Sequence, residues 1–208
     1  AWWLRLLLEG HSHVFASFLT LTYAEHSLKA QLDKRDVQTF LKRYRESFGS
    51  ARYFCVGEYG ARTGRPHWHM ILFSSVMRWL PGVHDLKQWP HGGVHVGDVT
   101  LASIAYTARY SLKTGPKGGS YVVLMSRRPG LGRTRLEEIA SYLASVQPRI
   151  EFVPHWWRVG TRMLPLDKTA RDWFLRAYEA SGGLVERRDH SPLALDLESR
   201  LLALWGDP

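Results

Sequence analysis

The sequence is poor in cysteine, with Cys55 alone among 208 residues. A single thiol excludes a disulfide within the chain and is typical of proteins from a reducing compartment. No apolar run approaches the roughly 20 residues that a membrane-spanning helix needs. The apolar stretch at residues 2–8 is also too short for a span and lacks the layout of a signal peptide. We therefore expect no membrane partner.

Acidic residues are scarce relative to basic ones. There are 19 Asp and Glu against 28 Lys and Arg, which gives a formal net charge of +9. Excess positive charge indicates a polyanionic partner, and nucleic acid is the first candidate. Nine Trp and nine Tyr add flat side chains on which unpaired bases can stack. An aromatic core with a basic surface for solubility explains the same composition, so composition alone leaves both interpretations open.

Hydrophobic periodicity predicts alternating strands and helices along the chain. We expect strands at residues 14–23, 52–58, 66–74, 93–97, 121–125 and 150–158, and helices at 36–48, 100–114, 135–144, 169–180 and 193–205. Asp36 is the expected cap of the first of these helices and Gly49 its end. Thr134 and Glu137 have the spacing of a capping box for the helix at 135–144.

The stretch Arg65–Phe73 contains two histidines, His67 and His69, in an apolar run. Side chains two apart on a strand share a face, so the two imidazoles point together while Trp68 points to the other side. If residues 52–58 pair with this strand as an antiparallel hairpin, Glu58 falls opposite His67. One carboxylate and two imidazoles would then form a three-ligand metal site with open positions.

The predicted helix at 100–114 places Tyr106, Tyr110 and Lys113 on one face, at positions i, i+4 and i+7. Its buried stripe is predicted at Leu101, Ile104, Ala105, Ala108 and Leu112. Metal-polarised phosphodiesters can be attacked by a tyrosine, which then holds the phosphorus covalently. Two tyrosines would let strands be exchanged without hydrolysis. Tyrosines at the edge of a core and a surface lysine explain the same helix face structurally.

Several motifs occur together in one order, namely residues 18–23, 40–43, 52–60, 65–73, 105–113 and 126–132. Together these stretches resemble the HUH endonuclease superfamily, and more narrowly the replication initiator (Rep) proteins of small single-stranded DNA phages, the microviruses and gokushoviruses. The resemblance covers roughly residues 15–170. It differs in that Trp68 is bulky for the position between the histidines, and residues beyond about 183 match nothing in the family.

The resemblance implies an α+β fold, a central antiparallel sheet with flanking helices related to the ferredoxin-like and RNA-recognition arrangements. It implies an HUH endonuclease domain at residues 1–183 and a C-terminal linker with a possible helix at 184–208. The implied activity is rolling-circle replication initiation by a site-specific endonuclease. It nicks single-stranded origin DNA with Mg or Mn and keeps the 5′ phosphate on a tyrosine.

Further expectations follow from the resemblance. Metal ligands are His67, His69 and Glu58. Tyr110, three residues before Lys113, is the obligatory nucleophile and Tyr106 the second. The expected DNA contacts, on a monomer in the cytoplasm of a bacterial host together with the host replication machinery, are Thr20, Thr22, Arg65, Arg109, Arg127 and Arg128.

Three alternatives stay open. The chain could be another HUH nuclease, such as a plasmid initiator, a relaxase or a single-tyrosine transposase. It could be a non-catalytic nucleic-acid-binding module with a similar sheet, or a phosphoesterase that uses water as the nucleophile. The remaining candidate ligands lie outside apolar strands or beside glycines, and we expect them to be structural or surface residues: His11, His13, His91 and His95.

Overall fold

The computed structural model describes residues 2–29, 31–60, 62–76, 78–110 and 122–186, except that the side chain of Tyr110 is not described. These residues form two compact units, one of residues 13–128 and one of residues 1–12 with 129–208. Each unit is treated separately below. The predicted boundary between a domain at 1–183 and a C-terminal segment at 184–208 borders residues outside the described part and stays a prediction.

The unit of residues 13–128 is built on a six-stranded antiparallel sheet with the order β4-β5-β1-β3-β2-β6. The strands are β1 (Phe15–Thr22), β2 (Ala51–Tyr59), β3 (Pro66–Ser74), β4 (Gly82–His84), β5 (Val94–Asp98) and β6 (Val122–Met125). The predicted α+β class with a central antiparallel sheet is confirmed. The two strands predicted to carry Glu58 and the histidines lie near the middle of the sheet.

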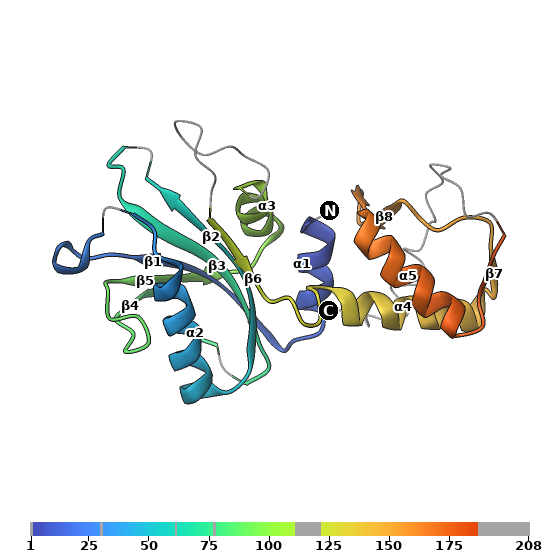
Figure 1. Cartoon of the computed structure of the whole chain (residues 1–208), viewed down its shortest axis with the longest axis horizontal. Helices are drawn as coiled ribbons and strands as arrows, with labels where there is room; N and C mark the ends of the chain where they lie inside the picture. Colours follow the sequence, from blue (N-terminus) through green and yellow to red (C-terminus); the bar gives the residue numbers. More distant parts are fainter. Residues whose placement is uncertain (1, 30, 61, 77, 111–121, 187–208) are drawn as a thin grey trace. The chain divides into compact units, whose positions relative to one another are not determined.

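Helix α2 (Lys34–Phe48) covers one face of this sheet (Figure 1). The predicted stripe is buried: Val37, Phe40, Leu41 and Tyr44 are at most 2% exposed and pack against alternate residues of the strands. Gly49 ends the helix with a φ of 88°, a conformation that glycine adopts without strain. The apolar stripe of the sequence therefore determined how this helix packs.

The predicted cap of α2 was wrong by one turn. The helix begins at Lys34, and Asp33 caps it by accepting a hydrogen bond from the backbone N–H of Arg35 at 2.9 Å. Asp36 lies within the first turn, buried, and accepts from the Tyr23 hydroxyl at 2.7 Å and the Lys29 ammonium at 2.8 Å. Its carboxylate thus ties the connection after β1 to the helix.

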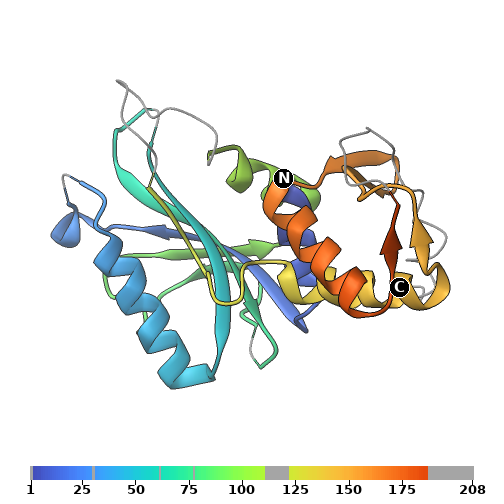
Figure 2. The same ribbon diagram turned by 45° about the vertical axis from the view of Figure 1, so that its right-hand side comes forward.

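Helix α3 (Leu101–Tyr110) lies on the opposite face of the sheet, over β2 and β3 (Figures 1 and 2). Thr100 precedes it as predicted and accepts from the backbone N–H of Ser103 at 3.1 Å. Leu101 was predicted to be buried but is 44% exposed, whereas Thr107 is fully buried and donates to the Ser103 carbonyl at 2.8 Å. The buried side of α3 is therefore rotated towards Thr107, with Ile104 and Ala108.

The second unit contains α1 (Trp2–Gly10), α4 (Arg133–Val146) and α5 (Lys168–Ala180), with the short strands β7 (Arg149–Ile150), β8 (Trp156–Val159), β9 (Arg162–Pro165) and β10 (Leu184–Val185). The three helices share one apolar core that includes Leu4, Leu136, Trp157 and Phe174. The strand predicted at 150–158 is interrupted, because residues 151–155 include Pro154, which has no N–H to donate.

The predicted capping box of Thr134 and Glu137 is not formed. The α4 helix begins one residue earlier, after Gly132 in the left-handed conformation with a φ of 76°. The Gly132 N–H donates to the buried carboxylate of Glu9 at 2.7 Å, and Glu137 accepts from Arg133 at 2.7 Å. A long-range carboxylate therefore replaces the local cap.

Candidate functional site

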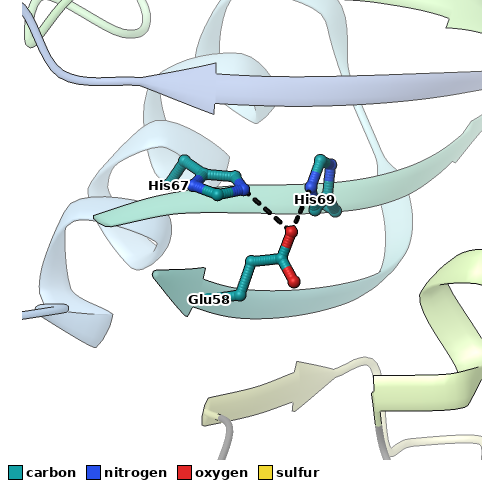
Figure 3. Close-up of side chains that lie close together, drawn as sticks. All are labelled: Glu58, His67 and His69. Carbon is teal, nitrogen blue, oxygen red and sulfur yellow. Dashed lines mark hydrogen bonds and ion pairs between the residues drawn. The ribbon is translucent and has the colours of Figure 1, made fainter. Parts of the chain in front are cut away.

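The β2–β3 hairpin brings one carboxylate and two imidazoles together on the face that α3 covers. Glu58 pairs directly with His67 across the two strands, and His69 lies two residues further along β3. Because side chains two apart on a strand share a face, all three project to the same side (Figure 3). The pairing has the register that the hairpin prediction required.

Three donors converge on one oxygen of Glu58. His67 Nε2 lies 2.8 Å and His69 Nε2 2.9 Å from Glu58 Oε1, and the Tyr106 hydroxyl donates to the same atom at 2.9 Å. Glu58 and His69 are 7% and 8% exposed. A buried carboxylate is costly unless it is paired, so these contacts hold Glu58 in place and bring α3 onto the sheet.

Both imidazoles are held at the ring nitrogen that faces away from Glu58. His67 Nδ1 lies 3.2 Å from the Arg65 carbonyl, and His69 Nδ1 lies 3.0 Å from the Thr20 hydroxyl. Burial lowers the pKa of His67, but its hydrogen bonds to Glu58 and to the Arg65 carbonyl raise it more, so the pKa lies above the ordinary 6.5. Each Nε2 is thereby directed at Glu58.

The donor set fits a divalent cation. The three ligand atoms lie within 4.8 Å of one another. Two ligands about 2.1 Å from an octahedral ion and at right angles are about 3.0 Å apart, close to the two His–Glu separations seen here. Imidazoles suit borderline transition metals and a carboxylate suits Mg²⁺ or Mn²⁺, so the mixed set favours Mn²⁺ over Mg²⁺. Glu58, His67 and His69 are the residues that would hold the ion.

The residue between the histidines explains how the sequence fixes this geometry. Trp68 is fully buried on the α2 side, where its Nε1 donates to the Tyr23 hydroxyl at 3.0 Å. Its partner across the hairpin is Gly57, and a Cβ there would lie 2.7 Å from the Trp68 ring. The bulk of Trp68, a departure from the resembling family, is thus accommodated by the glycine beside Glu58.

The structure brings some predicted site residues to the triad and leaves others elsewhere. Tyr106 and Thr20 contact it directly, and the Arg109 guanidinium lies 5.8 Å from the centre of the Tyr106 ring. The side chain of Tyr110 and all of Lys113 lie outside the described residues.

The other predicted DNA contacts have partners within the protein or are exposed. Thr22 donates to the Gly93 carbonyl at 2.8 Å. Arg65 pairs with Glu25 and donates to the Tyr23 carbonyl at 2.8 Å. The side chains of Arg127 and Arg128 are exposed in the turn after β6.

One contributor to the site was not predicted. The Phe18 ring stacks on the His69 imidazole, with centroids 5.6 Å apart and planes 6° apart. Alternation along β1 already placed Phe18 and Thr20 on the same face. Only the pairing of β1 with β3, which sets Thr20 opposite His69, shows that this face meets the histidines.

Comparison with known proteins agrees with these features. Residues 16–115, which include the whole triad and Tyr106, match the family of the Replication-associated protein ORF2. The Replication-associated protein VP4 of Bdellovibrio phage phiMH2K is 34% identical over 46% of this chain and 38% of its own. The Replication-associated protein ORF4 of Chlamydia phage 1 is 33% identical over 51% of this chain and 32% of its own.

A third relative, the Replication-associated protein ORF2 of Spiroplasma virus 4, is 28% identical over 54% of this chain and 43% of its own. The matched part thus spans about a third to two fifths of the length of these relatives. No solved structure matches the chain. None of the helices among the described residues has both the length and the apolar character that crossing a membrane requires. The predicted resemblance to replication proteins of small single-stranded DNA phages is confirmed by the family match and by these relatives.

Proposed function

We propose that this protein is a rolling-circle replication initiator of the HUH type, a metal-dependent endonuclease and strand transferase that acts on single-stranded origin DNA. The observation that carries the proposal is the position of the Tyr106 hydroxyl, 2.9 Å from the Glu58 oxygen and 3.4 Å from His69 Nε2. A phenol beside a Glu-His-His cluster suits attack on a phosphodiester held at that cluster.

The chemistry assigns a separate task to each group. Glu58, His67 and His69 hold the divalent ion, which when bound would polarise the phosphate oxygens and neutralise their charge. The Tyr106 hydroxyl donates its proton to Glu58, which leaves the oxygen lone pairs to face an incoming phosphorus. In the step itself a tyrosine oxygen bonds to phosphorus and the bond from phosphorus to the 3′ oxygen breaks. The phenol loses its proton, and the 3′ oxygen gains one.

Two tyrosines allow two successive cleavages without hydrolysis. Tyr110 stands one helical turn beyond Tyr106 in α3, and on the resemblance its spacing from Lys113 makes it the obligatory nucleophile. Tyr106 then serves the second cleavage and strand transfer. The 3′ hydroxyl released in the first step primes synthesis by the host polymerase, inside the bacterial host and by a monomeric protein.

The charge distribution supports a nucleic-acid substrate. The unit of residues 13–128 has 16 Lys and Arg against 7 Asp and Glu, a difference of +9 that equals the net charge of the whole chain. The excess positive charge therefore belongs to the unit that contains the triad. Phosphate groups are attracted to such a surface, and their binding displaces counterions.

The test uses a pool of random single-stranded oligonucleotides, labelled at either the 5′ or the 3′ end, incubated with the protein and Mn²⁺. Retention of the 5′ phosphate predicts that only the 3′ label travels with the protein on a denaturing gel. Tyr110→Phe and a chelator should abolish this species, and Tyr106→Phe should form it but fail to complete strand transfer. Tyr142→Phe, on α4, is the matched control.

The other outcomes separate the alternatives. Cleavage with no label on the protein would indicate hydrolysis by water. Binding without cleavage, unchanged in His67→Ala, would indicate a non-catalytic module. Complete strand transfer by Tyr106→Phe would indicate a single-tyrosine enzyme.

A further inference from the structure

We infer that Thr20 is a positioning residue for the metal centre, which sets the orientation and the proton arrangement of His69. This inference rests on the proposed function, because it presumes that His69 is a ligand. The Thr20 hydroxyl lies 3.0 Å from His69 Nδ1, and the two residues pair directly between β1 and β3. The first sequence motif would thus act on the metal site through a histidine rather than through the DNA.

Three neighbours define the position of the His69 ring. Phe18 stacks on it with an interplanar angle of 6°, and Tyr106 packs edge-on at 88° with centroids 5.1 Å apart. These two contacts fix the plane of the ring, but a flipped imidazole would occupy the same plane. The Thr20 hydroxyl distinguishes the two orientations, because it bonds Nδ1 and so leaves Nε2 facing Glu58.

The two histidines are held by partners of different chemistry. His67 Nδ1 meets the Arg65 carbonyl, which can only accept a hydrogen bond. His69 Nδ1 meets a hydroxyl, which can both donate and accept. While Nε2 of His69 carries a proton towards Glu58, the hydroxyl donates to Nδ1. When Nε2 is bare and able to bind a cation, the proton sits on Nδ1 and the hydroxyl accepts it.

Thr20 therefore stabilises His69 both before and after a cation is bound. Partners of this kind, which bond the outer nitrogen of a metal-bound histidine, typically contribute 10- to 100-fold to metal affinity. Thr22 provides an internal comparison, since it projects from the same face of β1 but donates its hydroxyl to the Gly93 carbonyl instead. A role specific to Thr20 predicts that the two threonines differ.

The experiment titrates the full chain with Mn²⁺ and measures free Mn²⁺ by electron paramagnetic resonance. Thr20→Val removes the hydroxyl at nearly constant shape and should weaken Mn²⁺ binding about 10- to 100-fold. Thr20→Ser restores the hydroxyl and should bind within about threefold of the unaltered protein. Thr22→Val, the matched control, should bind Mn²⁺ as the unaltered protein does.

The outcomes separate this inference from the proposed function. If the unaltered protein binds no Mn²⁺, the metal centre itself is wrong. If it binds Mn²⁺ and Thr20→Val binds equally well, only the role of Thr20 is wrong; equal weakening in Thr20→Val and Thr20→Ser also overturns it, because the hydroxyl then explains nothing.

A measurement on the unaltered protein covers the case in which Thr20→Val does not fold. Long-range proton–nitrogen NMR spectra report which ring nitrogen of His69 carries the proton, with diamagnetic Zn²⁺ as the probe ion. Addition of Zn²⁺ should leave the proton on Nδ1, bonded to Thr20. A proton on Nε2 with Zn²⁺ on Nδ1 would overturn the inference.

Discussion

Gly57→Ala tests whether the tight crossing of the hairpin holds the site together. A Cβ at this position would lie 2.7 and 2.9 Å from two atoms of the Trp68 ring and 2.8 Å from Leu32 Cδ1. Carbon atoms in good contact are about 3.5 to 4.0 Å apart, so roughly 0.7 Å is missing on two sides. Trp68 cannot move freely because it is fully buried and hydrogen-bonded to Tyr23.

Overpacking of this kind costs about 1–3 kcal/mol. Urea unfolding followed by circular dichroism should show that loss in Gly57→Ala. Mn²⁺ affinity should fall as well, because Trp68 stands between the two histidines. Gly97→Ala is the matched control: it lies in β5 of the same sheet, and its new Cβ would be 3.9 Å from Phe18. A loss in Gly57→Ala no larger than that in Gly97→Ala would refute the packing argument.

Three further predictions concern pH, a buried network and salt. Because the pKa of His67 is raised above 6.5, its protonation stabilises the metal-free fold below about that pH, and this stability is lost as pH rises through the higher folded-state pKa; urea unfolding of His67→Gln should lack this dependence. Tyr23→Phe should cost about 1–3 kcal/mol, because Asp36 and Trp68 both lose a buried partner, whereas the more exposed Tyr142→Phe should stay within about 0.5 kcal/mol on thermal unfolding. Affinity for single-stranded DNA should fall steeply with salt, with a slope of about −0.7 per neutralised phosphate in a titration series; a flat response would count against a DNA partner.

The hairpin and its ligands were predictable because their signals are local. Two strands joined by a short polar turn pair with their neighbours, and once Glu58 falls opposite His67 the period of two places His69 on the same face. The amphipathic stripe of α2 was equally clear, since four apolar side chains repeat at helical spacing. These elements needed no knowledge of distant parts of the chain.

What the sequence could not supply was the long-range pairing. Asp36 has a good residue type for a cap, but a buried tyrosine and a lysine from the preceding connection use its carboxylate. Glu9 caps α4 from 123 residues away, which no local motif reveals. Phe18 and Thr20 were known to share a face, yet their contact with His69 depends on the register between β1 and β3.

The central claim is that a tyrosine of α3 attacks a DNA phosphate beside the Glu58, His67 and His69 cluster. The direct measurement is mass spectrometry of the protein after incubation with single-stranded DNA and Mn²⁺, followed by digestion with nuclease and trypsin. Cleavage after Arg109 separates Tyr106 and Tyr110 into different peptides, so each tyrosine is assigned independently. The account predicts a nucleotide 5′ phosphate on the peptide that begins with Tyr110, absent in Glu58→Gln. Cleaved DNA with both tyrosine peptides unmodified would contradict it.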